Sequence, residues 1–147
     1  MRTSSEWPSW ARSRHVYASR VRLFLVRHAE AAPGEPDELR ALTAAGRNAA
    51  RALGEHLAAE QPTAVVSSPL LRARETADLI ARACKLHATT DERLAPGATI
   101  ETLREAAANK GKTVVAVAHQ PDCSEIVFAL TERDVSFRPA GVTELDL

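Results

Sequence analysis

Three short, mainly apolar runs constrain most strongly how this chain can fold. They lie at residues 21–26 (VRLFLV), 63–66 (TAVV) and 113–118 (TVVAVA). Runs of this length without polar alternation are typical of strands that are buried on both faces of a parallel sheet. Between them, apolar residues recur at helical spacing, so strands and helices alternate along the chain. The sequence therefore predicts an α/β fold, a three-layer αβα sandwich with a mostly parallel sheet.

The segments between these strands contain recognisable helix signals. Leu42-Thr43 opens the first predicted helix, and Ser68-Pro69 opens the second with a hydroxyl cap and a proline in the first turn. A third helix is predicted at residues 99–108, and a fourth follows Pro121. Residues 86–89 resemble a weak strand, and residues 142–147 alternate as an edge strand does. The first helix is expected to bury a face made of small and aliphatic residues, namely Ala45, Ala49, Leu53 and Leu57.

Length and composition are those of one globular domain. The chain has 147 residues, of which 45% are hydrophobic and 26% charged. No run approaches the roughly 18 apolar residues that a membrane span needs, so an integral membrane protein is not expected. The two cysteines, Cys84 and Cys123, lie on apolar helix stripes and are interpreted as buried free thiols. Free thiols favour a cytoplasmic location.

The formal net charge of zero is a sum over two unlike parts. Residues 1–20 carry four arginines and one glutamate, for a net charge of +3, which leaves −3 on residues 21–147. The first segment holds Trp7, Trp10 and Tyr17 but has no helical or strand period. We expect a disordered N-terminal extension before a single domain at 21–147; a transit peptide and an overlong translation start are alternatives. Neither part has the pattern of a nucleic-acid binder.

Basic side chains follow each of the three strong strands. Arg27 and His28 come at the end of the first, Ser68 and Arg72 after the second, and His119 after the third. The carboxyl ends of parallel strands lie at one edge of a sheet, where ligands bind in folds of this type. Arginine donates paired hydrogen bonds to phosphate, and a helix N-terminus also favours an anion. The sequence therefore predicts an anion site at this edge.

Each of these residues also has a purely structural interpretation. A single arginine on a helix is usually solvated, and a single histidine after a strand usually has a structural partner. Their recurrence at three strand ends favours the site, because core packing does not require cations at one edge. Arg74 lies roughly 200° around the helix from Arg72 and is expected to face away. His15, His56 and His87 are assigned no role.

Four motifs, taken together, resemble the histidine phosphatase superfamily, and within it the small SixA-type phosphohistidine phosphatases. The resemblance covers residues 21–147 and implies a phosphoglycerate mutase-like fold. The motifs are LVRHAE at 25–30, LTxxG at 42–46, SSPLxRAxxTA at 67–77 and VAHQP at 117–121.

The resemblance implies a role for each basic residue. His28 would be the nucleophile and become transiently phosphorylated, and His119 would act beside it. Arg27, Arg72 and His119 would bind the phosphoryl group together with His28. Fixed arginine charges can stabilise the equatorial phosphoryl oxygens, so no metal and no cofactor are expected.

Two departures from the family pattern bear on the substrate. Ala29 stands where the family's Arg-His-Gly signature has glycine, a small change. More important, residues 94–97 (LAPG) hold no carboxylate, although relatives that act on phosphate esters place an acidic proton donor in that region. Asp91 and Glu92, just before it, are interpreted as solvated turn residues. An imidazole leaves more readily than an alkoxide without a proton donor, so the gap favours a phosphoramidate substrate.

The expected function is thus that of a metal-independent phosphatase that dephosphorylates phosphohistidine on a protein. The loop at 31–41 is short, which predicts a shallow, open site that can admit a phosphorylated side chain of another protein. A phosphatase for sugar phosphates or other small metabolites is the nearest alternative. A non-catalytic phosphoprotein-binding module is a further one, and a mutase is disfavoured by the missing acid. The sequence predicts no oligomeric state.

Overall fold

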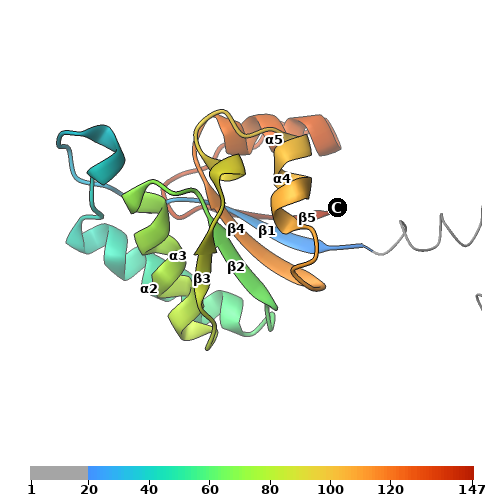
Figure 1. Ribbon diagram of the computed structural model, residues 1–147, viewed down its shortest axis with the longest axis horizontal. Coiled ribbons are helices and arrows are strands. Elements are labelled where there is room, and N and C mark those ends of the chain that lie inside the picture. Colours follow the sequence, from blue (N-terminus) through green and yellow to red (C-terminus); the bar gives the residue numbers. More distant parts are fainter. Residues whose placement is uncertain (1–19) are drawn as a thin grey trace, which may run out of the picture.

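The structure is a computed structural model that describes residues 20–147. The predicted N-terminal extension, apart from Arg20, lies outside the described residues. Strands and helices alternate along the described part of the chain (Figure 1). In chain order the elements are β1 (Arg22–Arg27), the short 3-10 helix η2 (Asp37–Leu39), α2 (Ala44–Ala58), β2 (Ala64–Ser67), α3 (Leu71–Ala83), β3 (Ala88–Thr90), the 3-10 helix η3 (Glu92–Leu94), α4 (Ile100–Ala107), β4 (Thr113–Ala118), α5 (Asp122–Thr131) and β5 (Val142–Asp146).

The five strands form one sheet in the order β3-β2-β4-β1-β5. The first four are parallel, and β5 pairs antiparallel with β1 at the edge. The three strands predicted from apolar runs lie side by side in the centre. Helices α2 and α3 lie on one side of the sheet and α4 and α5 on the other, as Figure 1 shows. The predicted three-layer α/β architecture with a mostly parallel sheet is confirmed.

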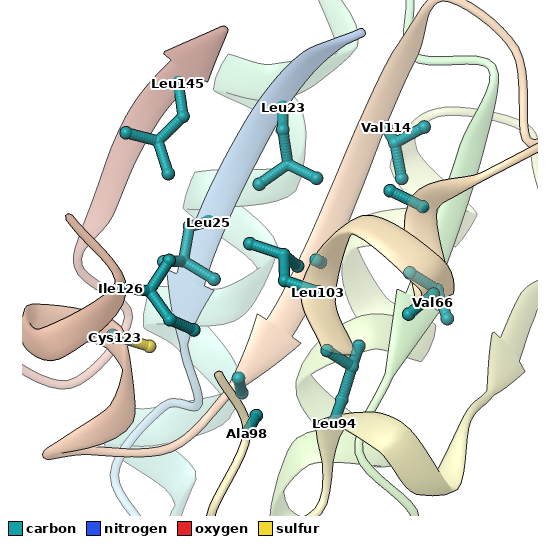
Figure 2. Packing of buried hydrophobic residues seen from close by; sticks show 14 of the residues in the cluster. Leu23, Leu25, Val66, Leu94, Ala98, Leu103, Val114, Cys123, Ile126 and Leu145 are labelled. Atoms are coloured by element: carbon teal, nitrogen blue, oxygen red, sulfur yellow. The ribbon is translucent and has the colours of Figure 1, made fainter. Parts of the chain in front are cut away.

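Residues that alternate along the central strands divide the core into two halves. Leu23, Leu25 and Val114 face α4 and α5, where they meet Leu103 and Ile126 (Figure 2). All five are at most 1% exposed. Burial of one such side chain contributes about 1.5–3 kcal/mol to folding. This packing holds β1 and β4, the strands that precede the two candidate histidines, in fixed positions.

The opposite half of the core packs against α3, which presents mainly small residues to the sheet. Phe24, Val26 and Val117 contact the buried face that contains Ala73 and Ala77. Alanine side chains let the helix backbone come close to the strands. The start of α3 is thereby held near the carboxyl ends of β2 and β4.

The buried face of α2 differs from the predicted one in the first half of the helix, whereas Leu57 is buried and Leu53 packs against the core as predicted. Ala45 and Ala49 are exposed, whereas Gly46, Ala50 and Gly54 are buried. The reason is close backbone approach: a Cβ on Gly46 would lie 2.2 Å from the Glu30 carbonyl oxygen. The pattern of hydrophobic side chains cannot indicate that a glycine is buried, because glycine has no side chain and its backbone makes the close contact. The helix is consequently rotated by about one residue from the expected orientation.

Two other boundaries also differ from the predictions. Helix α3 begins at Leu71, and its cap residue Leu70 makes no side-chain cap hydrogen bond. Ser68 is therefore not the helix cap; its hydroxyl accepts from the Leu70 amide at 3.2 Å. Strand β3 begins at Ala88, later than predicted, because the Leu86 amide still donates to the Ala81 carbonyl at the end of α3. No helix within residues 20–147 is both long and apolar enough to cross a membrane.

Candidate active site

The carboxyl ends of β1 and β4 bring two histidines together. Arg27, the last residue of β1, pairs in register with Ala118, the last of β4. His28 and His119 follow directly, and their ring centroids are 5.2 Å apart with the planes tilted by 57°. The convergence of these strand ends, predicted from the sequence, is present in the structure.

The ring of His28 has a defined tautomer. Its Nδ1 lies 2.8 Å from the carbonyl oxygen of Ala29. A carbonyl only accepts hydrogen bonds, so we assign the proton to Nδ1, which leaves a lone pair on Nε2. Burial lowers the pKa of His28, partly opposed by the bond to Ala29, and the charges of Arg72, Arg27 and Arg40 lower it further. His28 is therefore a neutral imidazole with one nitrogen ready to act as a nucleophile.

His119 is more deeply enclosed and is only 3% exposed. Its Nε2 lies 2.7 Å from the Ser68 hydroxyl, so the serine that the sequence suggested as a helix cap instead contacts this ring. Burial, followed by the proximity of His28 and Arg72, lowers the pKa of His119 to about 4. The ring is thus neutral near pH 7. The sequence suggested a cluster of cations, but here the charge resides on the arginines alone.

Arg27 is anchored from a distant loop. Its Nη1 donates to the carbonyl oxygen of Phe137 at 2.8 Å, in the segment between α5 and β5. Nothing in the sequence pattern pointed to that contact. Within residues 20–147, Arg27 Nε and His119 Nδ1 are the two buried side-chain atoms without a hydrogen-bond partner. Both belong to residues predicted to bind phosphate, and buried polar atoms without partners are costly unless a ligand meets them.

Arg72 lies in the first turn of α3 and is only 7% exposed, whereas Arg74 is exposed. This is the orientation that helical geometry predicted. The guanidinium of Arg72 donates twice to Asp37, from Nη1 to the backbone oxygen at 2.9 Å and from Nη2 to Oδ2 at 3.1 Å. Arg72 is close enough to both histidines to lower the pKa of each. The four predicted site residues therefore belong to one cluster.

The loop at residues 31–41 contributes two residues that the sequence analysis missed. Arg40 donates from Nε to the Ala32 carbonyl at 2.9 Å and from Nη1 to Asp37 Oδ1 at 3.2 Å. The loop whose short length predicted an open site therefore reaches the arginine cluster, where its Asp37 binds both Arg40 and Arg72. One signal could have indicated Arg40, because it lies in the loop that directly follows the first strand, at the ligand-binding edge of the sheet.

The region expected to lack a proton donor is occupied by other contacts. The carboxylate of Asp91 binds Arg93 at 2.8 and 2.9 Å, and this pairing lowers the pKa of Asp91. In the following loop, the amide of Gly97 donates to Asp122 Oδ2 at 2.8 Å. Asp91 therefore serves as a cap and ion-pair partner in the turn, but its side chain is only 14% exposed and is not solvated as expected, because it packs against Arg93.

The cysteines have no reactive surroundings. Burial raises the pKa of Cys84, and it raises that of Cys123 to about 12, so both are thiols at neutral pH. Across residues 20–147, no group of three or more His, Cys, Asp or Glu side chains is arranged to hold a metal ion.

The lowered histidine pKa values lead to a testable pH dependence. In an NMR titration, the His119 ring is expected to titrate near pH 4 and the His28 ring below the ordinary value of 6.5. Between pH 6.5 and 4, His119 is protonated in the unfolded chain but remains neutral in the folded protein. The free energy of unfolding should therefore be fully maintained above pH 6.5 and fall as the pH approaches 4. Urea unfolding at several pH values measures this, and a His119 midpoint at or above 6.5 would contradict it.

The arrangement can bind and attack an anion. Arg27, Arg72 and Arg40 supply fixed positive charge, and the neutral rings of His28 and His119 supply a nucleophilic nitrogen and a hydrogen-bonding group. Such a combination suits the transfer of a phosphoryl group, whose negative charge is spread over three oxygens.

Comparison with known proteins agrees with this chemistry. The profile of the histidine phosphatase superfamily (branch 1) matches residues 23–96. No curated protein sequence gives a significant match. Among solved structures, the chain is similar to the protein histidine phosphatase SixA complexed with tungstate, with 24% identity, a TM-score of 0.75, and coverage of 84% of this chain and 86% of that one.

Two further structures extend the comparison. A putative phosphohistidine phosphatase SixA from Agrobacterium tumefaciens is 29% identical, with a TM-score of 0.73 and coverage of 86% of this chain and 91% of that one. A mycobacterial glucosyl-3-phosphoglycerate phosphatase is 21% identical, with a TM-score of 0.64 and coverage of 86% and 90%. The second of these shows the shared phosphoglycerate mutase-like fold alone. The chain belongs to the histidine phosphatase superfamily and is a phosphatase enzyme.

Proposed function

We propose that this phosphatase removes the phosphoryl group from phosphohistidine on a protein, through a covalent intermediate on His28 and without a metal. One observation carries the proposal above the others. His28 has its Nδ1 proton held by the Ala29 carbonyl, so its Nε2 lone pair is free beside a cluster of arginines. The SixA-type relatives, two of them more than 25% identical, support the substrate class.

In the first step, Nε2 of His28 attacks phosphorus in line and the bond from phosphorus to the leaving group breaks. Arg27 and Arg72 hold the equatorial oxygens and stabilise their charge. His119 contributes a hydrogen bond from Nδ1 if the Ser68 hydroxyl donates to its Nε2. That assignment is supported by the Leu70 amide, which donates to the same Ser68 oxygen and leaves the hydroxyl proton to be directed at His119.

In the second step, water attacks the phosphorus on His28. Inorganic phosphate is released with both protons of the attacking water, and the electron pair of the broken P–N bond returns to Nε2. The same arginines stabilise both transition states, because the phosphoryl oxygens lie among them throughout. His28 leaves readily as an imidazole, which makes the covalent route favourable.

The leaving group decides between substrate classes. An alkyl ester departs as an alkoxide, which needs a proton in the transition state. Residues 94–97 offer no carboxylate for that purpose, and Asp91 is bound to Arg93. A phosphorylated histidine that carries a proton on its other ring nitrogen departs as a neutral imidazole and does not require such a donor. This favours phosphohistidine over sugar phosphates and other alkyl monoesters.

A substrate panel in the presence of EDTA tests the proposal. The purified protein should hydrolyse a histidine-phosphorylated protein with a kcat/KM at least about tenfold above that for a sugar phosphate, since each tenfold corresponds to about 1.4 kcal/mol of transition-state stabilisation. Phosphate release and loss of the phosphohistidine NMR signal provide two independent measurements.

The same panel distinguishes the alternatives. Higher efficiency toward the sugar phosphate would indicate a small-metabolite phosphatase, and binding of the phosphoprotein without turnover would indicate a binding module. Loss of activity in EDTA that is restored by a divalent ion would contradict the metal-free mechanism.

A further inference from the structure

The carboxylate of Asp37 lies between two arginines of the site. Its Oδ2 is 3.1 Å from Arg72 Nη2, and its Oδ1 is 3.2 Å from Arg40 Nη1. Among residues 20–147, no other carboxylate is hydrogen-bonded to Arg72. A negative charge at this position opposes the binding of a dianionic phosphoryl group, so its presence needs an explanation.

Asp37 does not replace the missing proton donor. Hydrogen bonds from Arg40 and Arg72 lower the pKa of Asp37, so it is a carboxylate at neutral pH. Its charge nevertheless acts within the site, because it raises the pKa of His119, whereas burial of the ring lowers that pKa. Asp37 is therefore a fixed negative charge close to the reacting groups.

The position of Asp37 relates it to the leaving group. The Asp37 side chain is 60% exposed, whereas His28 is half-buried at the end of β1. An in-line attack by His28 expels the leaving group on the side of phosphorus opposite to His28. Because the substrate is carried by another protein, its leaving group has to lie on the solvent side of the phosphoryl group, and the exposed carboxylate of Asp37 can be reached from that side.

We infer that Asp37 is a specificity-determining residue that favours a phosphoryl group carried by a protonated, cationic imidazole ring and disfavours an ester. The inference rests on the proposed function and names the group that selects its substrate. In phosphohistidine the ring can be protonated on the nitrogen that carries no phosphorus. A nearby carboxylate stabilises that imidazolium and repels the negative charge that develops on an ester oxygen.

The chemical step is balanced by this arrangement. A bond forms between His28 Nε2 and phosphorus while the bond from phosphorus to the substrate ring nitrogen breaks. The electron pair returns to that nitrogen, and the proton already on the other ring nitrogen stays there. A neutral imidazole therefore departs without any proton donor from the enzyme.

Two peptides of identical sequence, one with phosphohistidine and one with phosphoserine at the same position, test the inference. Asp37→Asn should lower kcat/KM for the phosphohistidine peptide about tenfold and leave that for the phosphoserine peptide unchanged or higher, because one partly screened charge interaction is lost. Asp37→Glu keeps the charge and should retain the ratio of the two values. Glu38→Gln is the matched control, since Glu38 is an exposed neighbour in η2.

The outcomes separate this inference from the proposed function. If Asp37→Asn lowers or raises both kcat/KM values equally, Asp37 only orients Arg72 or only competes with the phosphoryl group, and the inference is wrong. If the unsubstituted protein prefers the phosphoserine peptide, or hydrolyses neither peptide, the proposed substrate is wrong whatever the variants do. A thermal unfolding curve for each variant shows that a changed ratio does not arise from misfolding.

Discussion

Replacement of His28 by alanine is expected to lower kcat at least about a thousandfold while phosphate still binds. Alanine offers no nitrogen to form the bond to phosphorus, so the covalent route is lost. Arg27, Arg72 and Arg40 remain and can still hold the anion. Steady-state phosphate release measures the first effect, and calorimetric titration with inorganic phosphate measures the second.

A matched control keeps this result interpretable. His56 is an exposed histidine on α2, and His56→Ala should leave kcat unchanged. In a rapid-quench experiment with radiolabelled substrate, the unsubstituted chain should accumulate an acid-labile, base-stable phosphoryl group that His28→Ala lacks. Unchanged hydrolysis by His28→Ala would rule out the covalent mechanism.

Replacement of Arg72 by alanine is expected to lower kcat/KM about 100- to 1000-fold, which corresponds to about 3–4 kcal/mol of lost transition-state stabilisation. Arg72 is nearly buried, so water replaces its charge poorly. Arg72→Lys should recover only part of the loss, because an ammonium group cannot reproduce the paired hydrogen bonds of a guanidinium. Kinetics with the phosphohistidine peptide measure both variants.

The control for Arg72 lies two residues further along the same helix. Arg74 is exposed, and Arg74→Ala should change kcat/KM by less than about twofold, as exposed charges contribute little. Equal losses in Arg72→Ala and Arg74→Ala would show that the effect comes from overall charge or helix stability. In that case the assignment of Arg72 to the phosphoryl group would fail.

The central sheet could be predicted because its strands are buried on both faces. Thr113–Ala118 has the predicted bounds, and Arg22–Arg27 differs from the prediction by one residue. Once these strands are parallel neighbours, His28 and His119 must meet at their carboxyl ends. The proximity of the two histidines could therefore be predicted from the hydrophobic pattern, whereas the strand order and the orientation of their rings could not.

The loop contacts could not be predicted in this way. The positions of Arg40 and Asp37 depend on tertiary contacts, such as the Ala31–Leu42 bridge and the bond from Arg40 to the Ala32 carbonyl. No periodic pattern records such contacts. The hydrogen bond between Ser68 and His119 could not be predicted either, because a serine before a proline is also typical of a helix start.

The pairing of Arg27 with Ala118 has a consequence for how such a protein can diverge. His28 directly follows Arg27, and His119 directly follows Ala118. The separation of the two rings is therefore set by the hydrogen-bonded pairing of β1 with β4. An insertion or deletion of one residue within β1 or β4 would turn its histidine to the opposite face, while changes of length in the segment from 31 to 41 leave the ladder intact. Substrate preference can thus vary through that segment at little risk to the histidine pair.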